Sequence, residues 1–195
     1  ISEERKNQIA KQADQKFIDT LKWVSEIPTK KDEKFNDKIK YHKVELKDSN
    51  FAGIRAYCTS QKTITDILLQ IQSGFIQPKE AIMTVDSVER LAIDDKTFVT
   101  YAQMHAKMSG KTEQVTLLTT KKVDNKTVVV QTTVDLEELP EVAKRPNLRA
   151  QIFWLEEKQD SVDIEYFYHM DIPGAPAMMV NLGIKKRAGV LENLM

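Results

Sequence analysis

The sequence predicts an α+β fold in which a long C-terminal helix covers a twisted antiparallel sheet. Three observations lead to this fold class: an apolar stripe of helical period at the start, six strand-like segments between residues 81 and 170, and an apolar, basic segment after Pro173-Gly174. A twisted sheet of about eight strands must have its apolar face covered, and the terminal segment is the obvious cover.

Residues 1–24 are expected to form the N-terminal helix. Ser2 followed by Glu3 and Glu4 is typical of a helix start, because acidic side chains favour the first turn. The apolar residues of the stripe recur at three- and four-residue steps and are Ile9, Ala13, Phe17, Leu21 and Val24. One side of this helix should therefore pack on the rest of the chain.

The middle of the chain is predicted to be mostly strand. A charged loop over 28–38 leads to two strands that begin at Ile39 and Phe51, and a short helix starts near Thr63. Six further strands are expected at 81–91, 97–108, 113–122, 127–135, 148–156 and 161–170. Short links such as "IDDK" and "VDNK" carry hairpin residues, so neighbouring strands should be antiparallel.

Composition excludes several classes of function. The 29 basic and 29 acidic residues cancel, so no net field recruits nucleic acid. Cys58 is the single cysteine, and His42, His105 and His169 are far apart in sequence. We therefore expect no disulfide framework, no metal site and no cofactor.

Length and hydropathy indicate one soluble domain over 1–195, expected to be a monomer. No apolar run approaches the roughly 20 residues that cross a bilayer. The sequence begins at Ile1, which leaves the compartment open between the cytoplasm and a periplasmic or secreted location after loss of a signal peptide.

The end of the chain resembles the START lipid-transfer family of the helix-grip superfamily. The stretch "YHMDIPGAPAMMVN" is similar to the family's passage from last strand to final helix, through His169, Asp171, Pro173, Gly174, Pro176, Val180 and Asn181. "KRPNLRAQIFWLEE" is similar to an upstream family segment that leads into an aromatic strand. The resemblance implies a helix-grip, START-like fold, in which a curved antiparallel sheet wraps around a long C-terminal lid helix at 173–194. It also implies a cavity for one lipid or sterol-like ligand, and it allows transient contact with a membrane.

Polar groups on inward strand faces are candidates for contact with a head group. Tyr166 and Tyr168 share the apolar face of their strand, and a buried hydroxyl needs a partner because leaving it unpaired costs about 1–3 kcal/mol. That partner is either a lipid head group or sterol hydroxyl, or else water or a backbone carbonyl. Arg149 alternates with Gln151 and Phe153. If that face points inward, Arg149 is a candidate anchor; if it points outward, Arg149 is a surface charge.

The start of the terminal helix offers an adaptable apolar wall. Met178, Met179 and Leu182 lie there, and methionine is unbranched and polarizable, so it fits ligands of varied shape. Ordinary core packing explains the same residues without a ligand. The candidate ligand-binding residues are Tyr101, Met104, His105, Arg149, Phe153, Tyr166, Tyr168, Met178, Met179, Asn181 and Leu182.

No catalytic motif is present in the sequence. It lacks GxSxG, HExxH, a phosphate-binding glycine loop and paired Cys/His residues, so we expect a carrier that is not an enzyme and has no catalytic residue. Two alternatives stay open: a cavity enzyme of the same fold, cyclase-like or hydrolase-like, and a protein-interaction module. A cavity with convergent acid and base groups would favour the first, and a filled interior would favour the second.

Overall fold

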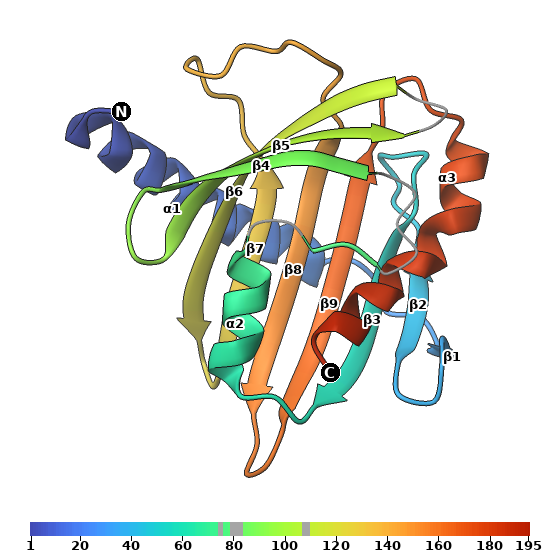
Figure 1. The fold of residues 1–195 in the computed structure, drawn as a ribbon. Helices are drawn as coiled ribbons and strands as arrows, with labels where there is room; N and C mark the ends of the chain where they lie inside the picture. Colours follow the sequence, from blue (N-terminus) through green and yellow to red (C-terminus); the bar gives the residue numbers. More distant parts are fainter. Residues whose placement is uncertain (74–75, 79–83, 107–109) are drawn as a thin grey trace.

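A computed structural model describes residues 1–73, 76–78, 84–106 and 110–195 of the chain. Over these residues, nine strands form one antiparallel sheet in the order β1-β2-β3-β9-β8-β7-β6-β5-β4 (Figure 1). The strands are β1 (Glu33–Lys34), β2 (Lys40–Val44), β3 (Gly53–Ser60), β4 (Thr84–Ala92), β5 (Thr97–Ala106), β6 (Gly110–Val123), β7 (Lys126–Thr133), β8 (Asn147–Glu157) and β9 (Val162–Asp171). This is the α+β architecture that the sequence predicts.

Helix α1 (Glu3–Ser25) lies behind the sheet in Figure 1, on the face called here the outer face. The Ser2 hydroxyl accepts a hydrogen bond from the Arg5 amide and caps the first turn. The predicted stripe packs inward, with Ile9, Ala13 and Phe17 buried against residues of β5 to β8. Helical period alone thus located this contact.

The opposite, inner face is covered by α2 (Ile64–Gln72) and by the C-terminal segment. The main apolar core lies here, between β3, β8 and β9 and the end of the chain. Ala188, Leu191 and Leu194 of the C-terminal segment are fully buried in it. Burial of apolar surface stabilises a fold by roughly 25 cal/mol per Å², so this contact contributes much of the stability.

The single lid helix expected at 173–194 is wrong in two respects. The helix begins at Ala177, after a turn in which Gly174 has a φ of +78°, and it divides into α3 (Ala177–Gly183) and the 3-10 helix η1 (Ile184–Asn193). A 3-10 helix repeats every three residues, which stacks Ala188, Leu191 and Leu194 toward the core. Packing of these side chains explains why the tighter helix is adopted.

Two smaller differences concern the strands. The loop expected at 28–38 contains β1, whose two residues pair with β2. Residues 81–83 of one expected strand and 107–108 of another lie outside the described residues. None of the described helices combines the length and apolarity needed to cross a membrane.

Candidate functional site

Buried polar side chains cross the inner face of the sheet from β5 to β9. The strand register places Thr100 opposite Thr116, Gln131 opposite Gln151, and Gln151 opposite Tyr168. The Gln131 amide also donates to the Thr116 hydroxyl over 2.7 Å. We call this set the polar row; it consists of Thr100, Gln114, Thr116, Gln131, Gln151 and Tyr168.

A small cavity lies against the polar row, below the C-terminal segment. Its volume is about 30 Å³, which is room for about one or two water molecules. Gln114, Gln131 and Gln151 line it from the sheet, and Arg187 lines it from η1. The interior predicted to hold a ligand is therefore nearly filled in this structure.

Several polar groups in this interior have no hydrogen-bond partner in the described part of the chain. They are Nε2 of Gln114 and the hydroxyls of Thr100 and Tyr166, and all three side chains are buried. Burial raises the pKa of Tyr166 far above its usual range, so its hydroxyl stays protonated. Each unpaired buried group costs about 1–3 kcal/mol, so the site is polar at a cost to stability.

Arg187 brings a positive charge to the same place. Its guanidinium carbon lies 4.4 Å from the ring centre of Tyr168, which is a cation–π contact. Burial raises the pKa of Tyr168, and the nearby Arg187 opposes that rise. The Tyr168 hydroxyl donates to the Met170 sulfur over 3.4 Å.

Four of the candidate residues lie together on the inner face. Met104 lines the cavity beside Tyr168. Phe153 and Tyr166 are fully buried, with ring centres 4.9 Å apart, and Tyr166 stacks on Tyr168 at 6.4 Å. Alternation along β5, β8 and β9 indicates which residues share a face, and the structure shows that the face with these four residues is the inner one.

Tyr101 and His105 are not part of this interior. They alternate with Met104 and so point to the other face of β5, where Tyr101 donates to Glu113 over 2.9 Å. His105 is exposed and pairs with Asp86 at 2.7 Å. A strand cannot present Tyr101, Met104 and His105 to one cavity, because neighbouring side chains point to opposite faces.

Arg149 is not a head-group anchor in the interior. The pairing of β8 with β9 shifts between Leu148 and Ala150. Because of this β-bulge, Arg149 does not point to the face that Gln151 and Phe153 share. Its guanidinium lies 4.4 Å from the ring centre of Trp23 in α1 and pairs with Asp48 at 2.8 Å. Arg149 therefore fastens α1 to the sheet.

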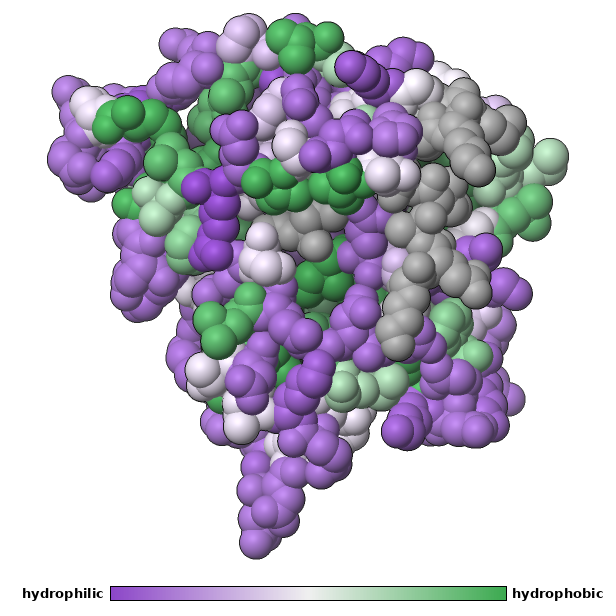
Figure 2. Space-filling model, viewed as in Figure 1, coloured by the Kyte–Doolittle hydropathy of each residue, from purple (hydrophilic) through white to green (hydrophobic). Residues whose placement is uncertain are grey.

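The four candidates on α3 do not line the cavity either. Met178 is 75% exposed, Met179 54% and Leu182 73%, and no residue of α3 is buried. Asn181 instead accepts a hydrogen bond from the Ala52 amide at 2.7 Å and donates to the Asn50 carbonyl at 2.9 Å. Figure 2 shows apolar residues at the right edge, where Figure 1 places α3.

Three residues that line the cavity, Gln114, Gln131 and Arg187, are not among those that the sequence predicts. The alternation on β6 and β7 was a usable signal, since it places both glutamines on the same face as core residues Leu118 and Val129. Arg187 carried no such signal, because a 3-10 helix follows a period different from the α-helical one assumed.

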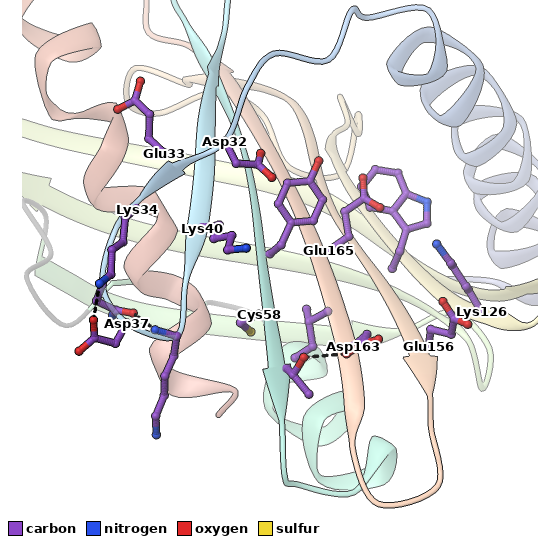
Figure 3. A pocket seen from close by; sticks show the side chains of 16 residues that line it. Asp32, Glu33, Lys34, Asp37, Lys40, Cys58, Lys126, Glu156, Asp163 and Glu165 are labelled. Carbon is purple, nitrogen blue, oxygen red and sulfur yellow. Dashed lines mark hydrogen bonds and ion pairs between the residues drawn. The ribbon is translucent and has the colours of Figure 1, made fainter.

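A larger hollow, of about 650 Å³, lies on the outer face between the β1–β2 hairpin and β8 (Figure 3). Polar groups at its wall have partners nearby: Lys34 forms an ion pair with Asp37 at 2.5 Å, and the Thr59 hydroxyl donates to Asp163 over 2.7 Å. Burial raises the pKa of the adjacent Cys58 thiol to about 12. Among the described residues no group of His, Cys, Asp or Glu could hold a metal ion.

Comparisons of sequence and comparisons of structure with known proteins give different results. No protein-family model matches the chain, and no curated protein matches it. Human StAR-related lipid transfer protein 5 superposes with a TM-score of 0.73 at 13% identity, covering 96% of this chain and 97% of that one.

Two further solved structures are similar. The STAR-related lipid transfer protein from Xanthomonas axonopodis gives a TM-score of 0.68 at 18% identity, covering 84% of this chain and 95% of its own. The human StarD13 lipid transfer and protein localization domain gives 0.63 at 13% identity, covering 91% and 96%. At these identities the likeness concerns the fold, and this chain has the helix-grip fold of the START-related lipid transfer structures.

Proposed function

We propose that this protein is a non-catalytic carrier that binds one amphipathic lipid between the inner face of the sheet and the C-terminal segment. The observation that carries the proposal is the polar row, whose buried donors lie in an apolar core below a separate chain segment. The similar solved structures are described as lipid transfer proteins, which supports the same class of ligand.

Binding requires the C-terminal segment to move. Ligand pockets have volumes of about 300–1,000 Å³, at least ten times the cavity seen here. Two hydrogen bonds of Asn181 hold α3, which buries no residue of its own, whereas η1 is fixed by fully buried side chains. We therefore expect α3 to leave first and the lipid chains to replace contacts of η1.

Contact with a membrane is the second part of the proposal. Met178, Met179 and Leu182 expose an apolar surface on α3, and methionine adapts to irregular apolar surroundings. Inserting this surface between lipid head groups would offset the cost of detaching α3 from the β2–β3 loop.

The wall of the cavity supports binding in preference to acid–base catalysis. Its described residues supply amides, a hydroxyl and a guanidinium, with no carboxylate or imidazole. This is the reason for choosing a carrier over a cavity enzyme of the same fold.

Transfer of a fluorescent lipid between donor and acceptor vesicles tests the proposal. The wild-type protein should accelerate transfer, and a variant with Met178→Ser, Met179→Ser and Leu182→Ser should slow it while lipid still co-purifies. Ile18→Ser is the matched control, because Ile18 is 57% exposed on α1 at the opposite face. Transfer that is no faster than without protein, together with the absence of lipid after incubation, would contradict the proposal.

The nearly filled interior favours one other function, a protein-interaction module. A module of this kind keeps the same cavity in the presence of lipid. Native mass spectrometry after incubation with vesicles distinguishes the two, since only a carrier gains the mass of one lipid.

A further inference from the structure

The polar row and Arg187 indicate which lipid the proposed carrier would select. Resting on that proposed function, we infer that the interior binds a lipid whose head group carries an anionic oxygen group, a phosphate diester or a carboxylate, and that Arg187 is the residue that selects it.

The unpaired groups in the interior are mostly donors. Nε2 of Gln114, which lines the cavity, can only donate. The hydroxyls of Thr100 and Tyr166 also have a proton to give, and they lie on the same face of the sheet outside the cavity wall. Arg187 adds a guanidinium with N–H donors and no acceptor. A head group that satisfies Gln114 and Arg187 in the cavity must bring several acceptors, as the oxygens of a phosphate or carboxylate do.

Charge points to the same ligand. None of the described residues that line the cavity is acidic, and no described carboxylate forms an ion pair with Arg187. Its described contact is with Tyr168, and a guanidinium that rests on an aromatic ring keeps N–H donors available for an anion. Charge-assisted hydrogen bonds of this kind are about twice as strong as neutral ones.

The position of Arg187 is fixed by its neighbours in η1. Ala188, Gly189 and Val190 follow it and are all buried, so the backbone at this point is packed on the core. The guanidinium is thus held against the cavity wall opposite Gln114, Gln131 and Gln151. A lipid lying between sheet and η1 would meet Arg187 at its head group and the apolar core along its chains.

Competition between lipids tests the inference. Vesicles of a neutral, phosphate-free galactolipid would contain equal amounts of phosphatidylglycerol, oleic acid, diacylglycerol and cholesterol, and protein recovered from them would be analysed by native mass spectrometry. We expect the wild type to favour the two anionic lipids by about tenfold or more over the neutral ones, as a charged hydrogen bond allows. Arg187→Gln should lose this preference and still bind lipid.

Matched controls separate the inference from the function on which it rests. Lys185→Gln removes a positive charge two residues away, on an exposed side chain, and should keep the preference. An equal loss of preference in both variants would mean that the preference arises from attraction of the positively charged protein to anionic vesicles, and it would overturn the role of Arg187. Wild-type binding without preference would overturn the inference and keep the carrier, whereas no lipid at all would end both.

A last experiment distinguishes binding of a lipid from binding of a free anion. Sodium phosphate or acetate should leave the mass and the melting temperature of the wild type unchanged. Binding of either ion as tight as that of phosphatidylglycerol would show a site for a small oxyanion and overturn the lipid assignment. Thermal unfolding of Arg187→Gln, expected to match the wild type closely, would show that lost preference is not lost folding.

Discussion

Glu113 and Gln114 are neighbours on β6 and point to opposite faces of the sheet, and their surroundings differ. Glu113, on the outer face, accepts hydrogen bonds from the Val142 amide at 2.9 Å, the Tyr101 hydroxyl at 2.9 Å and the Arg145 guanidinium at 2.8 Å. Gln114, on the inner face, has an amide nitrogen with no partner among the described residues.

The difference separates a structural cluster from the surface that we propose binds a ligand. Arg145 also donates to the Leu139 carbonyl at 2.7 Å, so the Glu113 cluster fastens the segment between β7 and β8 to the sheet. A buried charge is tolerated there because it is fully paired. The unpaired donors of the inner face fasten no segment and add nothing to stability. This is the pattern expected where a ligand completes the hydrogen bonding.

The largest effect should come from breaking the outer cluster. Glu113→Gln leaves Arg145 without its carboxylate, and removal of one partner of a buried pair costs about 3 kcal/mol or more. Urea unfolding measures this loss. Glu157→Gln, on an exposed side chain at the end of β8, is the control and should change stability by less than about 0.5 kcal/mol.

Acid should weaken the same cluster. Burial alone would raise the pKa of Glu113, but the hydrogen bonds from Val142, Tyr101 and Arg145 lower it overall. A carboxyl with a lowered folded-state pKa stabilises the protein above its unfolded pKa, and this contribution is lost as pH falls through the folded value. Melting temperature should therefore drop below about pH 4.5 in the wild type, and more shallowly in Glu113→Gln. Parallel curves for the two proteins would show that Glu113 is not responsible.

Tyr101→Phe should have an intermediate effect. The variant removes one hydrogen bond to Glu113 and leaves the ion pair to Arg145, so we expect a loss of about 1–2 kcal/mol. A double-mutant cycle with Glu113→Gln should give a coupling energy clearly above zero. Additive effects would mean that Tyr101 contributes only through its packing.

The smallest effect is expected on the inner face. Gln114→Leu removes a buried amide whose nitrogen has no partner among the described residues, so stability should stay the same or rise by up to about 1 kcal/mol. Gln131→Leu is the matched variant: it loses the bond to Thr116 and should cost about 1 kcal/mol. If Gln114→Leu lowers stability more than Gln131→Leu does, the polar row has a structural role, and the contrast between the two faces of the sheet does not hold.

Much of the fold follows from periodicity. The step of three to four residues in α1 indicated its buried side, and the alternation in β5, β8 and β9 indicated which residues share a face; the structure shows that the face with Met104, Phe153, Tyr166 and Tyr168 is buried. The motif ending at Asn181 indicated the fold, although Asn181 serves as a clamp on the β2–β3 loop. These are local properties, because the direction of a side chain repeats with the backbone period.

Tertiary packing alone decided the rest. The bulge that turns Arg149 outward depends on the register of β8 against β9, and the 3-10 form of η1 depends on how Leu191 and Leu194 fit the core. The sequence by itself determined which residues alternate, and so which could share a face. Segments distant in sequence decide which face is covered and whether a buried amide has a partner there. The reason is that hydrogen bonds and packing in the core require contacts that no local period specifies.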